Sequence, residues 1–265
     1  MLQIKSVYKT FNAGTINEKK ALNGLNLTLN EGDFVTVIGG NGAGKSTMLN
    51  MIAGVYPVDC GSIIIDGEDV TRLPEFKRAK FLGRVFQDPM MGTAADMMIE
   101  ENMALASRRG MKRTLRWAIN NKERDEFKKL LTMLGLGLEN RLSTKVGLLS
   151  GGQRQALTLL MATMRKPKLL LLDEHTAALD PKTAATVLQI SDKLIKEDNL
   201  TALMITHNMK DAIAYGNRLI MMNEGKIILD VSGEEKKRLT VDDLLAAFTK
   251  ISGSEFVNDR ALLTK

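Results

Sequence analysis

Apolar and polar positions along the chain form two kinds of strand pattern. Residues 2–11 and 25–29 alternate between apolar and polar positions, and a polar loop at residues 12–20 separates them. Residues 34–38 and 168–173 are more continuously apolar, which is typical of strands that are buried on both faces of a sheet. The predicted strands are 2–11, 25–29, 34–38, 62–66, 83–87, 168–173, 201–206, 218–222 and 226–230.

Helical patterns occupy most of the remaining chain. The predicted helices are 45–53, 93–107, 111–120, 123–134, 151–164, 181–196 and 241–250. Pro181 stands in the first turn of one of them, where proline is favoured. Four helices in succession between residues 90 and 165, with no strand among them, indicate a helical insertion within a mixed α/β lobe.

Composition indicates a soluble globular protein, since 44% of the 265 residues are hydrophobic and 26% are charged. The single cysteine, Cys60, has no partner for an internal disulfide, which suits a reducing compartment. No apolar run approaches the roughly 18 residues of a membrane-spanning helix, and the first residues lack the apolar region of a signal peptide. We therefore expect a cytoplasmic chain.

The net charge of +6 is concentrated in one stretch, residues 107–124. This basic window holds seven basic residues against one acid, Glu123, so it accounts for the whole excess. Its basic residues are Arg108, Arg109, Lys112, Arg113, Arg116, Lys122 and Arg124. The rest of the chain is balanced, which predicts one local basic patch and no extended nucleic-acid-binding surface.

A glycine-rich segment between the predicted strand at 34–38 and the helix at 45–53 matches the phosphate-loop pattern G-x-x-x-x-G-K-[ST]. This phosphate loop consists of Gly39, Gly40, Asn41, Gly42, Ala43, Gly44, Lys45, Ser46 and Thr47. Its glycines let backbone N–H groups surround an anion, and the helix N-terminus adds its positive dipole end. We expect Lys45 to reach the β- and γ-phosphates of a nucleotide and the Ser46 hydroxyl to bind Mg²⁺.

Two acids follow the buried strand at 168–173. Asp173 at the strand's carboxyl end is placed to hold Mg²⁺, directly or through water. Glu174 is placed to accept a proton from an attacking water or to orient that water. Taken alone, the two acids are equally well explained as a strand end that meets solvent, and the phosphate loop favours the catalytic interpretation.

The segment Leu149, Ser150, Gly151, Gly152, Gln153, here called the signature corner, precedes the predicted helix at 151–164. Ser150 is suited to cap that helix and the glycines to form a bend before it. The same capped helix start, with two bare glycine N–H groups, is also a second anion receptor.

With these three elements in order, the chain resembles the nucleotide-binding subunit of an ABC transporter over residues 1 to about 230. The resemblance implies that Gln87 belongs to the glutamine loop, that His207 is the switch histidine and that Phe11 stacks on adenine, with Tyr8 as a weaker candidate. It also implies that Ala178, Leu179 and Asp180 form the loop that crosses to a partner subunit.

The fold implied by the resemblance is an α/β P-loop NTPase of ABC type, with a RecA-like core, an antiparallel β subdomain and an inserted α-helical subdomain. We expect residues 1–89 and 166–232 to form the nucleotide-binding core with its β subdomain. Residues 90–165 then form the inserted helical subdomain, and residues 233–265 form a short helical tail.

The resemblance further implies a composite site that is completed by a second copy of the chain. Two ATP molecules lie between the copies, each held by one copy's phosphate loop and covered by the signature corner of the other, Ser150 to Gln153. Ser46, Gln87 and Asp173 hold Mg²⁺, and Glu174, His207, Gln87 and Lys45 carry out hydrolysis. Closure adds donors to the triphosphate and excludes water.

Two positions depart from the family's commonest pattern, Gly40 and His175, because proline is frequent at both. Gly40 should loosen the entry to the phosphate loop slightly. His175 places a titratable ring beside Glu174, from which we hypothesise a modest pH sensitivity of turnover near neutrality. The alternative is a spacer residue that faces solvent.

The function implied is ATP hydrolysis that powers a membrane ABC transporter from the cytoplasmic face of the membrane, with the permease as separate chains. The segment 91–106 and residues 174–180 are similar to the ATPases of bacterial importers of hydrophobic or aromatic amino acids, and such an importer implies a substrate-binding protein as a further partner. The alternative is a soluble ABC-type ATPase acting on nucleic acid or ribosomes, although no sustained heptads and only one lobe are present. A phosphate-loop kinase leaves the signature corner unexplained.

The predicted helix at 111–120 bears Trp117 beside Lys112, Arg113 and Arg116. One interpretation is a solvated helix with a partly covered aromatic ring. The other is a contact with anionic lipid headgroups or with a permease loop, worth about 1 kcal/mol per basic residue near the membrane surface.

Overall fold

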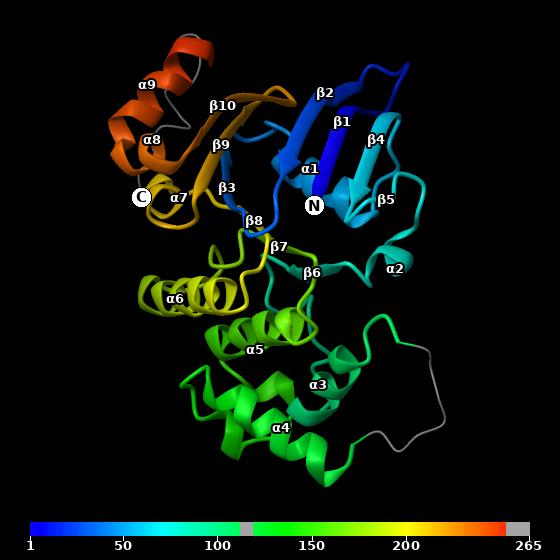
Figure 1. Ribbon diagram of the computed structural model, residues 1–265, viewed down its shortest axis with the longest axis vertical. Coiled ribbons are helices and arrows are strands. Elements are labelled where there is room, and N and C mark those ends of the chain that lie inside the picture. Colours follow the sequence, from blue (N-terminus) through cyan, green and yellow to red (C-terminus); the bar gives the residue numbers. More distant parts are fainter. Residues whose placement is uncertain (112–118, 253–265) are drawn as a thin grey trace.

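The computed structural model describes residues 1–111 and 119–252, which form two β-sheets and a set of helices (Figure 1). The strands are β1 (Leu2–Phe11), β2 (Lys19–Leu29), β3 (Phe34–Gly39), β4 (Cys60–Ile65), β5 (Glu68–Asp69), β6 (Leu82–Val85), β7 (Leu169–Asp173), β8 (Ala202–Ile205), β9 (Arg218–Asn223) and β10 (Lys226–Ser232). The helices are α1 (Lys45–Ala53), α2 (Glu75–Arg78), α3 (Ile99–Ser107), α4 (Asn121–Thr132), α5 (Gly151–Thr163), α6 (Pro181–Glu197), α7 (Met209–Ala214), α8 (Gly233–Arg238) and α9 (Val241–Ser252).

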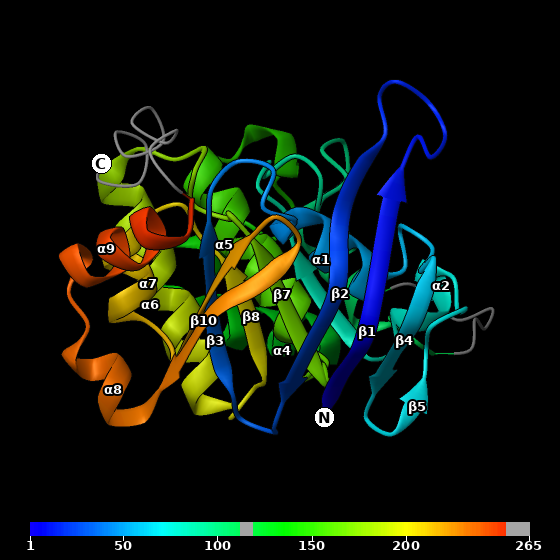
Figure 2. The ribbon, with the colours of Figure 1, turned by 90° about the horizontal axis from the view of Figure 1, so that it is seen from above.

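The two sheets differ in strand direction. The smaller sheet is antiparallel with the order β2-β1-β4-β5. The larger has the order β10-β9-β3-β8-β7-β6, and only the β9–β10 pair in it is antiparallel. Figure 2 shows the two sheets from above, with α1 close to both. The carboxyl ends of the parallel strands β3, β7 and β8 therefore meet at one edge, where nucleotide sites form in such sheets.

The central strands of the larger sheet are buried on both faces, as their apolar sequences predict. Every residue of β3 and β8 is buried, and so are the four leucines of β7. One face packs with α1 and the smaller sheet in a single cluster that includes Met48, Ile52 and Leu171. The other face packs with α5, α6 and the helical region. This double coverage holds the strand ends that carry the candidate site.

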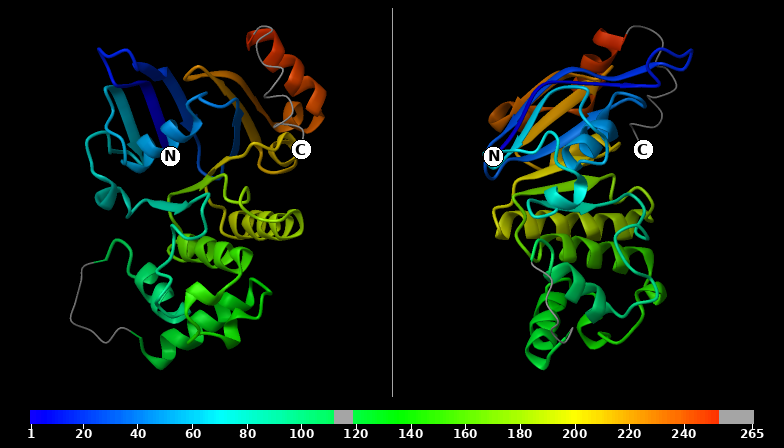
Figure 3. Two further views of the ribbon diagram at one scale, coloured as in Figure 1. Left: turned by 180° about the vertical axis from the view of Figure 1, so that it is seen from behind. Right: turned by 90° about the vertical axis from the view of Figure 1, so that its right-hand side faces the viewer.

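Helices α3, α4 and α5 lie between β6 and β7 in the chain and gather at the end of the molecule away from the smaller sheet (Figures 1 and 3). Their shared core includes Met103, Phe127 and Leu157. This is the span expected to form the inserted helical subdomain, and its exact boundaries stay a prediction. In the described part of the chain, no helix is long and apolar enough to cross a membrane.

Two predicted elements differ from the structure, and a third lies mostly outside the described residues. The helix expected at 93–107 begins only at Ile99, because the Asn102 side chain bonds both backbone groups of Ala94, with its Oδ1 2.8 Å from the Ala94 nitrogen, and so holds the preceding segment out of the helix. Most of the helix expected at 111–120, with Trp117, lies outside the described residues, and Asn120 caps α4. Strand β2 begins at Lys19, so the end of the expected polar loop is a strand paired with β1.

Short elements were not expected from the sequence. They include α2, β5, α7 and α8, each of two to six residues. The tail forms α8 and α9 up to Ser252, and α9 packs on α7 in a cluster with Leu244 and Phe248. Helix α7 directly follows the candidate His207, so the tail lies behind that part of the site.

Candidate active site

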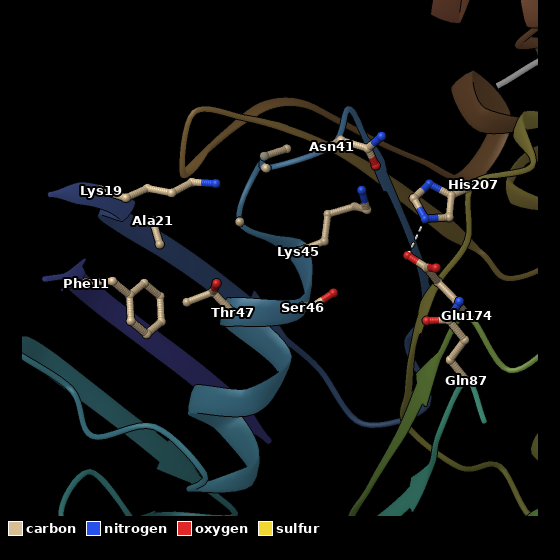
Figure 4. Close-up of a pocket in the computed structure, with 13 residues that line it drawn as sticks. Phe11, Lys19, Ala21, Asn41, Lys45, Ser46, Thr47, Gln87, Glu174 and His207 are labelled. Carbon is tan, nitrogen blue, oxygen red and sulfur yellow. Dashed lines mark ion pairs between the residues drawn. The ribbon is translucent and has the colours of Figure 1, made fainter. Parts of the chain in front are cut away.

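The phosphate loop connects β3 to α1 along a cavity of about 360 Å³ (Figure 4). Gly44 adopts a φ of 100°, and a Cβ built there would lie 2.5 Å from the Ala21 carbonyl oxygen. Gly39 has a φ of 151°, and its added Cβ would clash with the Met222 carbonyl oxygen. These positions exclude side chains for steric reasons. The loop backbone therefore lies flush against its neighbours and leaves its concave side for a ligand.

Lys45 begins α1 and lies inside the curve of the phosphate loop, with only 5% of its surface exposed. Its Nζ donates to the carbonyl oxygens of Gly39 at 2.7 Å and Gly40 at 3.1 Å. These contacts fix the ammonium over the loop. A buried cation in a glycine-rich cradle is suited to bind a polyphosphate.

Phe11, at the end of β1, lines the cavity together with the phosphate loop. Tyr56 meets its ring edge to face, with centroids 5.2 Å apart, and the Lys9 ammonium lies 5.7 Å from the Phe11 centroid. Tyr8, the weaker candidate, does not line the cavity, and its hydroxyl lies over Gly24. Of the two candidates, Phe11 is therefore the aromatic ring that lines the cavity, and its stacking on adenine stays a prediction.

Asp173 ends β7 and is held by a half-buried arginine, Arg84, that was not predicted from the sequence. Arg84 on β6 places its Nη2 3.6 Å from Asp173 Oδ2 and 2.7 Å from Asn50 Oδ1 on α1. Burial raises the pKa of Asp173, and the Arg84 charge partly offsets this rise. Arg84 thus ties the predicted metal ligand to the helix that carries the phosphate loop.

The predicted metal ligands fit Mg²⁺ better than a cation that needs a full cage of protein ligands. Ser46 and Gln87 line the cavity, and Asp173 is at the end of the neighbouring strand. All three offer oxygen atoms, which Mg²⁺ prefers. Among the described residues, no group of three or more acids, histidines or cysteines gathers. Such a site relies on phosphate oxygens and water for its remaining ligands.

Two of the four predicted catalytic side chains, Glu174 and His207, contact each other. Glu174 Oε1 lies 2.5 Å from His207 Nε2, and both residues line the cavity (Figure 4). Glu174 has a φ of 46°, which is costly for a residue other than glycine, and its N–H donates to the Ile205 carbonyl at 3.1 Å. The strained backbone directs the carboxylate away from the sheet and into the cavity.

The signature corner does not line the cavity of its own chain. Ser150 caps α5 by accepting from the Gln153 N–H at 3.3 Å, and the Gln153 side chain accepts from the Ser150 N–H at 3.2 Å. Ser150 and Gly151 are exposed, whereas Gly152 is buried against Thr183 of α6. The expected cap is confirmed, and the contact of this corner with the nucleotide of a second copy stays a prediction.

His175 differs from both interpretations made from the sequence. Its ring is 1% exposed, and Nε2 lies 2.9 Å from the Ser191 hydroxyl of α6, which is also within hydrogen-bond distance of the Val187 carbonyl. The ring tautomer sets whether Nε2 or the Ser191 hydroxyl donates in this bond. Burial lowers the pKa of His175 to about 4. The ring is neutral near pH 7, so the expected pH sensitivity from this residue and its solvent-facing alternative are both wrong.

The cavity also holds residues that were not predicted. Lys19 and Ala21 line it from β2, opposite the phosphate loop. Both were missed because the strand was expected to begin at residue 25. The alternation of Lys19 and Ala21 about an outward Lys20 was the available signal.

Comparison with known proteins agrees with this geometry. The family described as ABC transporter matches residues 22–177. The tyrosine transport ATP-binding protein of Clostridioides difficile (strain R20291) is 45% identical over 94% of this chain and 98% of its own length. The spermidine/putrescine import ATP-binding protein PotA of Haemophilus influenzae (strain ATCC 51907 / DSM 11121 / KW20 / Rd) is 35% identical over 89% of this chain, which spans 59% of that relative.

Solved structures show the same fold. The post-hydrolysis ATP-binding cassette MJ0796, described as dimeric and bound to ADP and Pi, superposes with a TM-score of 0.74 at 30% identity, covering 88% of this chain and 98% of that one. The ADP conformation of the cassette MJ1267 gives a TM-score of 0.75 at 28% identity, covering 94% and 98%. Both are cassettes of the α/β architecture expected from the sequence.

Proposed function

The chain belongs to the ABC transporter family of ATP-binding subunits, whose ATP hydrolysis is coupled to transport, and from this premise we propose how its site works and what it serves. It binds ATP with Mg²⁺ between two copies of itself. It hydrolyses ATP to drive a separate membrane permease at the cytoplasmic face, as an importer of an aromatic amino acid.

The observation that carries the proposal is the convergence of distant segments on one cavity. Phe11, the phosphate loop, Gln87, Glu174 and His207 all line it, although they come from five separate parts of the chain. An aromatic platform at one end and a buried cation in a glycine cradle at the other match the base and the phosphates of a nucleotide. Glu174 and His207 face the end where the terminal phosphate belongs.

Each catalytic residue then has a defined task. Lys45 and the loop N–H groups hold the β- and γ-phosphates, and Ser46, Gln87 and Asp173 would hold Mg²⁺, which would supply positive charge against the phosphates. Glu174 orients the attacking water and accepts its proton as oxygen bonds to the γ-phosphorus and the bond to the β-phosphate oxygen breaks. His207 must leave Glu174 to donate to a γ-phosphate oxygen.

The exposed signature corner supports a second copy as partner. Ser150 and Gly151 face solvent at the start of a helix, so they are available to a triphosphate on another chain. The solved cassette MJ0796 is described as dimeric. A corner that faces the partner's phosphate loop completes the donors that one cavity lacks.

Mixed dimers test this arrangement. Lys45→Ala disables one copy's loop, and Gly151→Asp places a negative charge on the other copy's corner. In a mixed dimer the intact loop of the Gly151→Asp copy faces the intact corner of the Lys45→Ala copy, so one complete site remains. With Glu174→Gln in both copies to slow hydrolysis, we expect ATP-dependent association only when the two variants are mixed, measured by analytical ultracentrifugation. No recovery on mixing would contradict the shared site.

A groove of about 1930 Å³ supports docking of the permease between α2 and the helical region. Its rim carries exposed apolar side chains, including Phe76 and Leu105, which suit a protein partner. Two residues of the basic window already form ion pairs within the chain: Arg108 pairs with Glu123 at 3.0 Å and Arg124 with Glu100 at 2.8 Å. These two contribute less to a lipid contact than the sequence suggested.

Docking and cargo need separate tests. Phe76→Asp should abolish co-purification with the permease and leave ATP binding unchanged, whereas Ile16→Asp, on the exposed loop after β1, should change neither. The name of the tyrosine transport relative supports an aromatic amino acid as cargo, and PotA supplies the contrasting case of polyamines. With permease and substrate-binding protein reconstituted in vesicles, tyrosine should stimulate ATP hydrolysis. Stimulation by spermidine and none by tyrosine would refute the cargo assignment.

A further inference from the structure

Lys19 is a cation that the catalytic scheme leaves without a task. It begins β2, where its Cα pairs with that of Phe11, and it lines the nucleotide cavity. Its side chain extends from β2 toward the phosphate loop (Figure 4), and its Nζ lies 3.2 Å from the point where a Cβ on Gly42 would stand. Lys19 therefore spans the distance between the base platform and the phosphate cradle.

The other cations around the cavity are engaged by the protein itself. Lys9 pairs with Asp59 at 2.6 Å, and Lys45 donates to the carbonyls of its own loop. Within residues 1–111 and 119–252, the Lys19 ammonium makes no hydrogen bond and faces no carboxylate within ion-pair distance. A side chain of this kind, held over a phosphate loop by a paired strand, is available to an anionic ligand.

We propose that Lys19 is a nucleotide-binding residue that contacts the phosphate next to the ribose, an inference that rests on the proposed ATP site. With the base on Phe11 and the β- and γ-phosphates in the loop, the ribose and first phosphate must lie between them. Lys19 bridges this same interval. The contact adds positive charge where Lys45, at the far end of the triphosphate, supplies none.

The position of the contact predicts its kinetic signature. The phosphate next to the ribose does not change its bonds during hydrolysis, and ADP carries it as well as ATP. The contact is therefore equally strong before and during the reaction, which lowers KM without changing kcat. A contact with the γ-phosphate would instead affect ATP alone.

The test compares Lys19→Gln with Lys20→Gln as the matched control. Lys20 is the next residue of the same strand, is exposed and points to the opposite face. We expect Lys19→Gln to raise the Kd of ATP and ADP by the same factor, about fivefold, and to raise KM at unchanged kcat. Lys19→Arg should retain most of the affinity. High salt should reduce the difference between wild type and Lys19→Gln.

Amine acylation followed by mass spectrometry gives an independent readout on the unmutated chain. ADP should protect Lys19 from modification and leave Lys20 as reactive as before. Unchanged affinity in Lys19→Gln, an equal loss in Lys20→Gln, a loss confined to ATP, or no protection of Lys19 would each overturn the inference. Lys45→Ala separates this failure from that of the site: if Lys45→Ala leaves nucleotide binding intact, the ATP site itself is wrong.

Discussion

The chain offers two glycine-bearing helix starts to an anion, the phosphate loop before α1 and the signature corner before α5, and their surroundings differ. The phosphate loop encloses a buried lysine and lines a cavity that an aromatic ring closes at the far end. The signature corner satisfies its own end, with Ser150 and Gln153 bonded to each other's N–H groups, and Gly151 faces solvent. Similar local chemistry thus gives one helix start that lines a cavity of its own chain and another that faces solvent, whose proposed ligand lies on a second copy.

The largest expected difference between the receptors concerns nucleotide binding by a single copy. Lys45→Ala removes the buried ammonium and should weaken ATP binding by the monomer about 100-fold or more. Gly151→Asp should leave that affinity within about twofold, because the corner does not touch the chain's own cavity, and a first-turn aspartate is compatible with α5. Isothermal calorimetry at concentrations that keep the chain monomeric measures both.

Hydrolysis should not separate these two variants. Both Lys45→Ala and Gly151→Asp are expected to lose ATPase activity, since hydrolysis needs the completed site. If Gly151→Asp weakened monomer binding as much as Lys45→Ala, the two receptors would belong to one chain, and the contrast between them would be lost.

A second difference between the two regions is what a side chain would contact at the glycine of each. Gly44→Ala meets the Ala21 carbonyl and a positive φ, so we expect a loss of about 3 kcal/mol in unfolding free energy. Gly67→Ala, with a φ of 81° and open space, isolates the φ cost at about 1 kcal/mol. Urea unfolding measures both.

The corresponding change in the signature corner, Gly152→Ala, meets only the Thr183 side chain. Its loss should therefore be recovered by Thr183→Ala in the same chain. No side-chain substitution removes the Ala21 carbonyl, so a partner change that rescued Gly44→Ala would show that the loop backbone is not the constraint.

A third test concerns helix α6, which contacts the signature corner and the segment after Glu174, since Gly152 lies on Thr183 and the His175 ring bonds Ser191. The native pKa of His175, about 4, is below its unfolded value of about 6.5, so below pH 6.5 the unfolded state binds the proton first. Stability should fall as pH drops from 6.5 toward 4, by about 2 kcal/mol at pH 5 from this residue. The measurement is the difference in unfolding free energy between pH 7 and pH 5.

The control for the acid effect is His175→Leu, which cannot take up a proton. This variant is expected to lose stability at pH 7 through repacking and the loss of the Ser191 bond, and to show an acid-induced decline about 2 kcal/mol smaller. Equal declines in wild type and His175→Leu would place the native pKa of His175 near its ordinary value.

The smallest effect concerns the capping bond of the signature corner. Ser150→Ala should reduce the unfolding free energy by about 1 kcal/mol, and Ser150→Asp, which keeps a cap acceptor, should recover most of it. Both variants should still lose ATP-driven dimerisation, because Asp brings charge against a phosphate. Full dimerisation by Ser150→Asp would mean that this side chain only caps the helix.

The sequence was sufficient for the parts of the fold whose signal is local. Three elements begin and end within about one residue of expectation: β3, α1 and β7. Their bounds are set by apolar runs and by neighbouring residues in the sequence, and not by contacts with distant parts of the chain. The predicted start of α3 was wrong because the Asn102 side chain bonds the backbone of Ala94, eight residues earlier in the chain, and holds it out of the helix. No periodicity in the sequence reports such a contact.

The candidate site divides in the same way. The loop residues, Glu174 and His207 were identifiable from pattern and resemblance, and the structure brings them to one cavity. Arg84 was not, since a lone arginine in a short strand has many partners open to it until Asp173 and Asn50 are placed beside it. The burial of His175 was equally hard to predict, because the residue that its ring bonds, Ser191, lies 16 residues further along the chain.

The contact between Glu174 and His207 has a consequence for the ATP that unassembled copies of the chain consume. While the two side chains engage each other at 2.5 Å, the carboxylate oxygen proposed to act on water and the histidine nitrogen proposed to act on phosphate are bonded to each other. A monomer with bound nucleotide, not associated with a second copy or with the permease, is therefore expected to hydrolyse ATP slowly. Copies made in excess of the other transporter subunits would therefore consume little ATP.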